Sequence, residues 1–466
     1  MKKITIGMII LAIFLVSTIF PVLVNATYIT TNKLNNKIIV KDSFNMIIIA
    51  PSGYNNALEP FVEHKDSLGI ITKFVSLDDI YAGKYFSVQG RDNQEKIKYF
   101  IKDAIETWGI TYVLFVGNFK QVPVRYCYND DNYSSFPEPK FVSELYYADI
   151  YDENRDFSSW DTDGDLIFGE WDDEVAEDRL IDLTPDVCLG RLACANVNEI
   201  IIVVNKIINY EGQTADPSWF KRMVVVGGDT YQEFEGYEGE IYNQQAVDAM
   251  EGFTPVKLWA STGALKTGKD IAREINKGCG FWYLSGHGAS SVWVTYTPPP
   301  DRRPVGNFNA FNILSLSNKY KLPVCVVGGC HNSEFAVSAK TSTKALNLFA
   351  WLRECWSWQL VSKPNGGSIA TIGPTGLAWY SAEYDGEGVN WLNVQFFKEY
   401  ANDTVVLGQI WKKALTHYLE NNTIDWETPF GSADSIDAKT AQEWTLLGDP
   451  SLTIGGSNEK PFSKNR

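Results

Sequence analysis

The chain has 466 residues, of which 45% are hydrophobic and 14% aromatic, so it can bury a large core and is not intrinsically disordered. Its 41 basic and 57 acidic residues give a formal net charge of −16. A surface of this sign repels phosphate backbones, and because no basic stretch interrupts it, we expect no nucleic-acid partner.

The first 26 residues have the pattern of a secretory signal peptide. Lys2 and Lys3 precede a nearly uninterrupted apolar segment over 4–24, which ends before the small-residue pattern at 24–26. We therefore predict a signal peptide over 1–26 and a secreted or cell-surface protein; cleavage would bring the net charge to −18. The segment is long for a signal peptide, so an uncleaved membrane anchor remains the alternative. We expect no other membrane contact.

After a short lead over 27–44, apolar strands alternate with amphipathic helices. This order is typical of a parallel sheet whose strands are joined by crossover helices. The predicted elements are strands at 46–50, 72–76, 112–116 and 187–192 and helices at 58–68, 94–108 and 197–210. An insertion rich in Asp, Glu, Tyr and Ser, from about 129 to 186, precedes the last strand. We assign 45–213 to an N-terminal α/β subdomain.

The same pattern begins again after residues 211–217, where we expect the boundary. The predicted elements are strands at 223–226, 255–259, 281–284, 324–327 and 367–372 and helices at 240–250 and 268–276. We assign 214–454 to a C-terminal subdomain and 455–466 to a polar tail. The predicted fold class is α/β, with two consecutive Rossmann-like subdomains built on parallel sheets.

Three apolar strands of the second half each lead to one reactive side chain. The runs MVVVGGD, FWYLSGHG and PVCVVGGC place Asp229, His287 and Cys330 just beyond the strands, at the edge where ligands bind in open α/β sheets. A thiol, an imidazole and a carboxylate are the groups of an activated cysteine nucleophile. Taken singly, a cysteine after an apolar run is more often a buried hydrophobic residue, and a lone histidine is more often structural.

The stretch DTDGDLIFGEWDDE predicts a structural calcium site. Hard oxygen ligands at this spacing are typical of an EF-hand-type loop. The predicted ligands are Asp161, Asp163, Asp165, the backbone of Ile167, and Asp172. Two features depart from the pattern: Leu166 stands where glycine makes the sharp turn, and position 12 is Asp rather than Glu. The alternative is a solvated acidic loop that binds no specific ion. We expect no organic cofactor.

Seven cysteines are an odd number for an exported chain, so at least one unpaired thiol is expected. Cys188 and Cys325 lie in apolar strands and are better interpreted as buried thiols than as disulfide partners. Any pairing among the others stays open.

The order of these motifs resembles that of the gingipain-type cysteine peptidases, family C25 of the caspase-like clan. The resemblance is carried by the strand before Gly286-His287-Gly288, the strand before Cys330, and the closing EWTLLGDPSLTI at 443–454. It covers nearly the whole chain after residue 26. It implies a caspase-like fold for the C-terminal subdomain and a cysteine endopeptidase activity.

The resemblance also implies a role for each matching residue. Cys330 takes the place of the nucleophile, His287 that of the general acid and base, and the N–H groups of Gly288 and Cys330 that of the oxyanion hole. Asp229 matches the carboxylate that orients the histidine, where the family has a longer Glu. More residues separate His287 from Cys330 than we expect for the family. Most of the additional residues lie in the segment TYTPPPDRRPVGNF, over 295–308, where we expect a Pro-rich loop that shapes substrate access.

The matching specificity pocket would favour a basic residue before the scissile bond. By the resemblance Glu240 supplies the pocket carboxylate, Trp379 an aromatic wall, and Ser285 a further substrate contact. A carboxylate there would pair with Arg or Lys of the substrate. Glu233, Glu235 and Glu238 lie close in sequence and are alternatives for the pocket acid.

The predicted function is therefore that of a secreted cysteine endopeptidase that cleaves proteins or peptides through a thioester acyl-enzyme. Two other functions remain open. One is a transpeptidase that processes surface proteins as sortases do, because an amine can resolve the thioester in place of water. The other is a catalytically inactive surface-binding protein of the same fold.

Overall fold

The computed structural model describes residues 43–129, 137–171, 175–213, 215–231, 236–337, 354–380 and 386–456. The predicted signal peptide, most of the predicted lead and tail, and Asp172, Glu233 and Glu235 lie outside these residues. Among the residues that are described, no helix combines the length and the apolar character needed to cross a bilayer.

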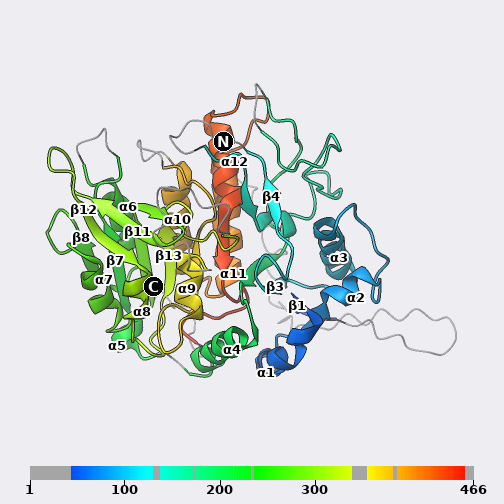
Figure 1. Ribbon diagram of the computed structural model, residues 1–466, viewed down its shortest axis with the longest axis horizontal. Coiled ribbons are helices and arrows are strands. Elements are labelled where there is room, and N and C mark those ends of the chain that lie inside the picture. Colours follow the sequence, from blue (N-terminus) through cyan, green and yellow to red (C-terminus); the bar gives the residue numbers. More distant parts are fainter. Residues whose placement is uncertain are drawn as a thin grey trace, which may run out of the picture. The chain divides into compact units, whose positions relative to one another are not determined.

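A ten-stranded β-sheet runs through the molecule in the order β2-β1-β3-β6-β15-β14-β13-β9-β7-β8 (Figure 1). Its strands are β1 (Met46–Ala50), β2 (Thr72–Ser76), β3 (Tyr112–Val116), β6 (Cys188–Leu192), β7 (Arg222–Gly227), β8 (Thr254–Trp259), β9 (Phe281–Ser285), β13 (Val324–Gly328), β14 (Ala370–Pro374) and β15 (Trp444–Leu447). The pairs are parallel except that of β14 with β15. The sheet therefore consists of two parallel halves that run in opposite directions.

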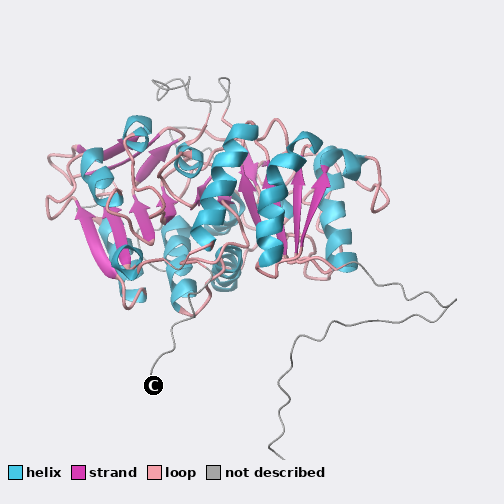
Figure 2. Cartoon of the chain, turned by 90° about the horizontal axis from the view of Figure 1, so that it is seen from below, coloured by secondary structure: helices cyan, strands magenta, loops and turns pink. Residues whose placement is uncertain are grey.

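Helices lie along the sheet and supply the crossovers that parallel strands require (Figure 2). They are α1 (Asn55–Ser67), α2 (Leu77–Tyr81), α3 (Asn93–Trp108), α4 (Val197–Glu211), α5 (Pro217–Phe220), α6 (Glu238–Ala249), α7 (Gly268–Ile275), α8 (Ala310–Leu314), α9 (Trp356–Ser362), α10 (Gly388–Ala401), α11 (Leu407–Asn421) and α12 (Ala433–Glu443). Two short 3₁₀ helices span Ser52–Tyr54 and Leu145–Tyr147. The mixed α/β architecture confirms the predicted fold class.

The inner strands β7, β9 and β13 of the second half are covered on both faces, which explains why they are nearly continuous apolar runs. Successive residues of β7 point to opposite faces. Met223 and Val225 belong to the core cluster that contains residues of α6 and α10, whereas Val224 and Val226 belong to the cluster that contains residues of α7, α8 and α9. A polar residue at any of these four positions would lose its hydration without gaining a partner.

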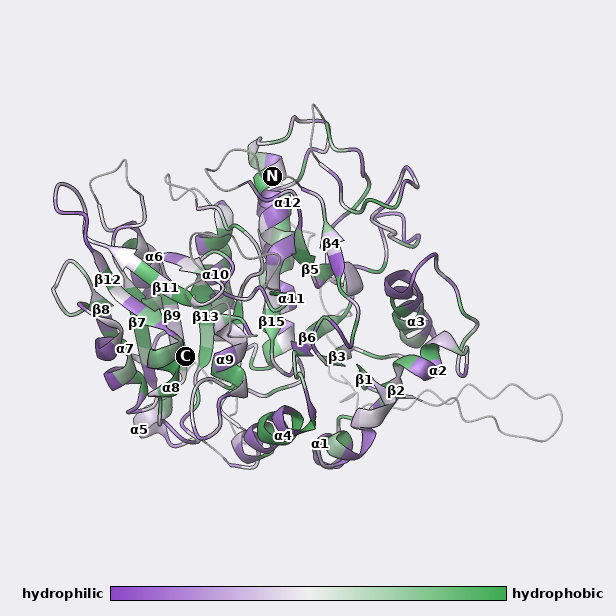
Figure 3. Ribbon diagram, viewed as in Figure 1, coloured by the Kyte–Doolittle hydropathy of each residue, from purple (hydrophilic) through white to green (hydrophobic). Residues whose placement is uncertain are grey.

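The amphipathic helices follow from spacing and caps. In α3 the buried residues Ile97, Ile101, Ala104 and Trp108 recur at helical intervals, and the Asp92 side chain caps the helix by accepting from Glu95 N. Figure 3 shows both hydrophobic and hydrophilic residues along α3 and α4. The predicted bounds of α3 differ from the observed ones by one residue at the N-terminus.

A three-stranded antiparallel sheet stands beside the second half and was not predicted. It contains β10 (His287–Ala289), β11 (Val292–Tyr296) and β12 (Pro304–Asn309). The expectation of a Pro-rich loop over 295–308 is thus wrong in extent, because half of the segment, 295–296 and 304–308, forms paired strands and only the tip at 297–303 is a loop. A further short pair joins β4 (Arg125–Cys127) and β5 (Phe141–Ser143).

The closing LGDPSL segment is held by a buried ion cluster. Nζ of Lys65, on α1, lies 2.7 Å from Glu211 and 2.5 Å from Asp449, and each of these side chains is at most 1% exposed. The segment therefore acts as a structural clasp between three distant parts of the chain. Strands from both predicted subdomains join one sheet, and the position of the boundary between them stays a prediction.

Candidate active site

The three strands that precede Asp229, His287 and Cys330 are neighbours in the sheet and end in register. Ser285, the last residue of β9, pairs with Gly328 of β13 on one side and with Gly227 of β7 on the other. Cys330, His287 and Asp229 each lie two residues beyond these paired positions. The structure thus places the predicted residues at one edge, with His287 on the strand between the other two.

The turns that carry His287 and Cys330 pack backbone against backbone. Gly286 N donates to Gly328 O at 3.2 Å. A β-carbon added at Gly288 would lie 2.7 Å from the Cys330 carbonyl oxygen, and one added at Gly329 would lie 3.1 Å from the carbonyl carbon of His287. Both positions require glycine because no side chain fits between the two turns. The predicted oxyanion residues Gly288 and Cys330 are consequently adjacent.

Cys330 differs from the other cysteines in being partly exposed. All seven cysteines are free thiols, and the remaining six are buried, so no disulfide forms among them. The Cys330 thiol donates to the Ala378 carbonyl at 3.7 Å. Burial raises the pKa of Cys330 to about 12, and the carboxylates of Glu443 and Glu138 add to the rise. In this resting arrangement the sulfur is a neutral thiol rather than a thiolate.

The imidazole of His287 is half-buried, and its Nε2 is covered from solvent. Its ring meets that of Tyr296 edge-on, with 5.5 Å between the centroids. Burial lowers the pKa of His287, and the positive charge of Arg302 lowers it further against the opposing effect of the Thr230 backbone. Within the described residues Nε2 has no hydrogen-bond partner. A neutral ring with an unpaired nitrogen can accept a proton from a thiol.

Asp229 lies at the neighbouring strand end but is not bonded to His287. Its backbone exchanges hydrogen bonds of 3.0 and 3.3 Å with Tyr296, and its side chain is fully buried. Burial raises the pKa of Asp229 to about 6, and the charge of Glu238 raises it further. Among the described residues neither carboxylate oxygen has a hydrogen-bond partner in the present geometry. The orienting role of Asp229 stays a prediction.

The first turn of α6 sits directly over the ends of β7 and β9. Gly239 N donates to Gly228 O at 3.0 Å, and a β-carbon at Gly239 would lie 2.6 Å from Ser285 O. This close approach places two acids, Glu238 and Glu240, beside the site. Their carboxylates are engaged differently: Glu238 accepts from Thr230 N at 3.0 Å, and Glu240 accepts from the backbone N–H and the hydroxyl of Ser261.

The other two predicted substrate contacts, Ser285 and Trp379, have different environments. The Ser285 hydroxyl is fully buried and donates to Asn390 Oδ1 at 3.0 Å. Trp379 follows Ala378, the acceptor of the Cys330 thiol, on the segment after β14. Trp379 is therefore next in the chain to the residue that contacts the Cys330 thiol, whereas the Ser285 side chain faces the protein interior. Both substrate roles stay predictions.

Two residues of the site were missed from the sequence. The amide of Asn332 is fully buried and donates to Ala289 O at 2.8 Å and Val292 O at 3.0 Å, which ties the Cys330 turn to the β10–β11 turn. The hydroxyl of Tyr380 donates to Gly286 O at 2.6 Å, one residue before His287. An Asn two residues after a strand-end cysteine was the available signal for Asn332.

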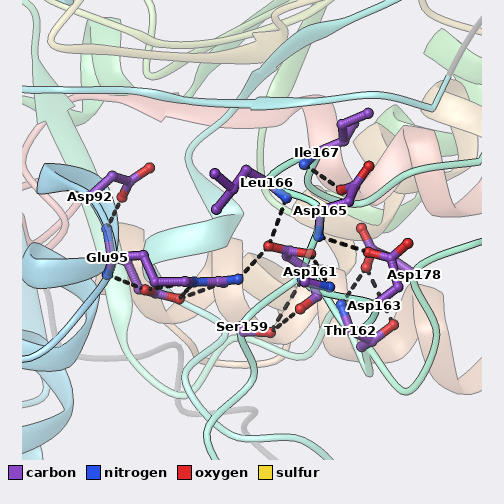
Figure 4. A network of polar contacts seen from close by, with 12 residues as sticks. Asp92, Glu95, Ser159, Asp161, Thr162, Asp163, Asp165, Leu166, Ile167 and Asp178 are labelled. Atoms are coloured by element: carbon purple, nitrogen blue, oxygen red, sulfur yellow. Dashed lines mark hydrogen bonds and ion pairs between the residues drawn. The ribbon is translucent and has the colours of Figure 1, made fainter.

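The acidic loop adopts a turn that gathers three of the predicted calcium ligands (Figure 4). Carboxylate oxygens of Asp161, Asp163 and Asp165 all lie within 4.8 Å of one another. Leu166 has a φ of 76°, so the chain makes the sharp turn there without the expected glycine. Arg91 also forms an ion pair with Asp161. The predicted ligand Asp172 lies outside the described residues, and calcium binding stays a prediction.

The sequence profile of peptidase family C25 matches residues 40–455. The chain belongs to peptidase family C25. It is 22% identical over 423 residues to gingipain R2 of Porphyromonas gingivalis. The aligned region covers 89% of this chain and 46% of that protein. Gingipain R1 of the same organism matches at the same identity, with 34% of its length covered.

The fold also resembles a solved structure of this family. The crystal structure of the Arg specific cysteine proteinase gingipain R superposes with a TM-score of 0.62 at 19% identity, covering 89% of this chain and 78% of the other. The predicted family and its fold are confirmed. The C25 chain spans less than half the length of the curated gingipains it matches.

Proposed function

We propose that this C25 chain is a cysteine endopeptidase that acts through Cys330 and His287. The observation that supports this most directly is the register of β9 and β13, which brings the two residues to adjacent turns whose backbones are in contact. Cys330 is the cysteine that combines partial exposure with a position at the ligand-binding edge of the sheet.

The proposed reaction starts from a neutral thiol and a neutral imidazole. When substrate binds, the Cys330 proton passes to His287 and the sulfur attacks the peptide carbonyl carbon. The N–H groups of Gly288 and Cys330 bind the resulting oxyanion. The C–N bond then breaks, His287 returns its proton to the leaving amine, and a water molecule, deprotonated by His287, hydrolyses the thioester and frees the thiol.

We further propose a preference for Arg or Lys before the scissile bond. Glu238 and Glu240 supply the negative charge, since both lie in the first turn of α6 over the ends of β7 and β9. The name of gingipain R supports the same preference, because that relative is described as Arg specific. From the sequence we also propose that the protein is secreted and that its acidic loop binds calcium.

Labelling by Lys- and Arg-based acyloxymethyl ketones tests the activity. Wild-type protein should be labelled once per chain and should cleave a peptide library, whereas Cys330→Ala and His287→Ala should do neither. His417→Ala is the matched control, since His417 is half-exposed and pairs with Glu399 far from the dyad in sequence. Equal labelling of wild type and Cys330→Ala would refute the proposal.

Two further outcomes identify the alternative functions. With an added amine nucleophile, ligated product in preference to hydrolysed product would indicate a transpeptidase. Binding of peptides without cleavage or labelling would indicate an inactive binding protein. For specificity, Glu240→Gln and Glu238→Gln are compared in the library assay, and the variant that loses the basic preference identifies the pocket acid.

A further inference from the structure

The β11–β12 hairpin brings a positive charge to the site that the proposed mechanism does not use. β11 pairs with β10 so that Val294 faces His287, and Tyr296 at its end bridges to Asp229. The hairpin therefore spans the ends of β9 and β7. Its tip, residues 297–303, contains two consecutive arginines, Arg302 and Arg303.

The two arginines have different environments. Arg303 is exposed and pairs with Asp301 at 3.3 Å. The guanidinium of Arg302 instead turns inward and lies 5.1 Å from the centroid of the Tyr296 ring. The same ring meets His287 edge-on at 5.5 Å. One aromatic ring thus contacts both the guanidinium and the proposed catalytic imidazole.

The end of the Arg302 side chain has no hydrogen-bond partner. In the part of the chain that the structure describes, Nη1 and Nη2 are both covered from solvent and unbonded. Asp229 is near enough to interact electrostatically with Arg302, but no hydrogen bond joins them. An arginine with unpaired terminal nitrogens is costly when buried, and its planar fork matches a carboxylate.

The geometry also indicates which part of a substrate Arg302 would meet. His287 protonates the leaving amine, so the first residue after the scissile bond must lie beside its ring. The Tyr296 ring contacts both His287 and Arg302, and Tyr296 also bridges to Asp229 at the end of β7. Arg302 is therefore placed to contact substrate residues that follow the cleaved bond.

We propose that Arg302 is a specificity-determining residue that binds a carboxylate located after the scissile bond of the substrate. This inference rests on the proposed peptidase function. The carboxylate has two sources, an Asp or Glu side chain in the first or second residue after the bond, or the free C-terminus of a substrate that ends there.

Matched internally quenched peptides test the proposal. One pair carries Arg before the bond and Asp or Asn directly after it. A second pair ends two residues after the bond as a free acid or as an amide. For wild type, kcat/KM should favour the carboxylate by about 10- to 100-fold in at least one pair, as expected for a charge-assisted hydrogen bond. The pair that responds identifies the source.

Variants at the hairpin tip assign the effect. Arg302→Met should abolish the preference and Arg302→Lys should retain part of it, whereas Arg303→Met should keep the wild-type ratio. Circular dichroism and thermal melting check that each variant is folded. A wild type that does not distinguish the peptides in either pair would overturn the proposal without any variant, as would a preference that persists in Arg302→Met.

A binding arm separates this proposal from the peptidase assignment. The same peptides are titrated against full-length Cys330→Ala, with and without Arg302→Met. If wild type cleaves nothing while Cys330→Ala binds the acidic peptide about tenfold tighter through Arg302, the peptidase function fails and the carboxylate site stands. If cleavage occurs but neither rate nor affinity distinguishes the peptides, the peptidase function is supported and the carboxylate site is refuted.

Discussion

Asn332 is hydrogen-bonded to Ala289 between the turns that carry Cys330 and His287, with its amide nitrogen 2.8 Å from the Ala289 carbonyl oxygen. The bond joins the segment after Cys330 to the strand that begins at His287. Because this hydrogen bond joins the two turns, it helps to fix the position of Gly288 N–H relative to Cys330 N–H. These two N–H groups form the proposed oxyanion hole. Asn332 is accordingly a positioning residue and does not touch the reacting atoms.

We predict that Asn332→Ala lowers kcat by about tenfold or more and leaves KM nearly unchanged, because misplaced oxyanion donors weaken the transition state more than substrate binding. One buried and one partly buried carbonyl also lose their donor, which should lower the free energy of unfolding by about 2 kcal/mol. Steady-state kinetics and urea unfolding measure the two effects. Asn209→Ala, at an exposed helical site, should change neither. A kcat equal to that of wild type would contradict the positioning role.

Tyr380→Phe removes one hydroxyl and keeps the ring. Its bond to Gly286 O fixes the peptide unit that leads into His287, so we expect kcat to fall severalfold and the unfolding free energy to fall by about 1 kcal/mol. Burial raises the pKa of Tyr380 well above its usual range, so the hydroxyl stays a donor at every pH used for assay. Tyr320→Phe, at an exposed site, is the control. A rate loss confined to high pH would argue against this role.

The pH dependence of kcat/KM should extend to acidic conditions. The depressed pKa of His287 keeps its ring neutral below the ordinary value of about 6.5, so the acid limb should lie below that pH. Arg302→Met removes a nearby positive charge and should move this limb to higher pH, whereas Arg303→Met should not. The measurement is a pH–rate profile at low substrate concentration. An acid limb above pH 7 in wild type would contradict a lowered pKa of His287.

The lowered pKa of His287 should also make the stability of the fold depend on pH. A histidine whose folded pKa is lowered binds fewer protons in the folded than in the unfolded state, so stability contributed by His287 is present above about pH 6.5 and is lost as the pH falls below it. Urea unfolding of wild type and His287→Gln between pH 5 and 8 should show the difference narrowing toward acid.

Lys65→Met should destabilise the fold by about 3 to 5 kcal/mol, because Glu211 and Asp449 would be left buried without their cation. Lys102→Met is the matched control, since Lys102 pairs with Glu106 at a solvent-exposed helical site and such pairs contribute under about 1 kcal/mol. Urea unfolding of both variants provides the comparison. Equal losses of unfolding free energy in the two variants would show that the buried ion cluster stabilises the fold no more than an exposed ion pair does.

Calcium removal should lower the melting temperature if the acidic loop binds the ion. At a calcium concentration about 100 times Kd the expected stabilisation is about 2.7 kcal/mol, and it should disappear in Asp163→Ala. Glu153→Ala, an exposed acid nearby in sequence, should respond as wild type does. A melting temperature that is the same in calcium and in EGTA would leave the loop as a solvated acidic turn.

The sequence predicted the strands well because they are short, continuous apolar runs bounded by polar residues. The observed bounds of β1, β2 and β3 coincide with the predicted ones. β1 and β3 are buried throughout, which leaves little choice of residue there, whereas the edge strand β2 also contains the partly exposed Lys73 and Phe74. The sequence of the β11–β12 hairpin favours a loop, because prolines are concentrated at its tip and neither flanking strand is a continuous apolar run. Its pairing with β10 is set by contacts with distant residues.

The positions of Cys330 and His287 at neighbouring strand ends could be predicted, but the contacts around them could not. Strand ends place Cys330 and His287 from local pattern alone. Asn332, Tyr380 and Arg302 matter through bonds or ring contacts to other segments, which no periodicity reveals. Likewise, the burial that keeps the Cys330 thiol neutral depends on how the segment around Ala378 packs against it.

The position of β15 between β6 and β14 bears on how the chain is synthesised. Residues 444–447 fill the middle of the sheet, although they emerge from the ribosome after the other nine strands of that sheet. Until they appear, β6 and β14 each present an unpaired edge, the kind of surface that joins other chains. The nascent protein therefore holds two incomplete half-sheets that its final strand must unite.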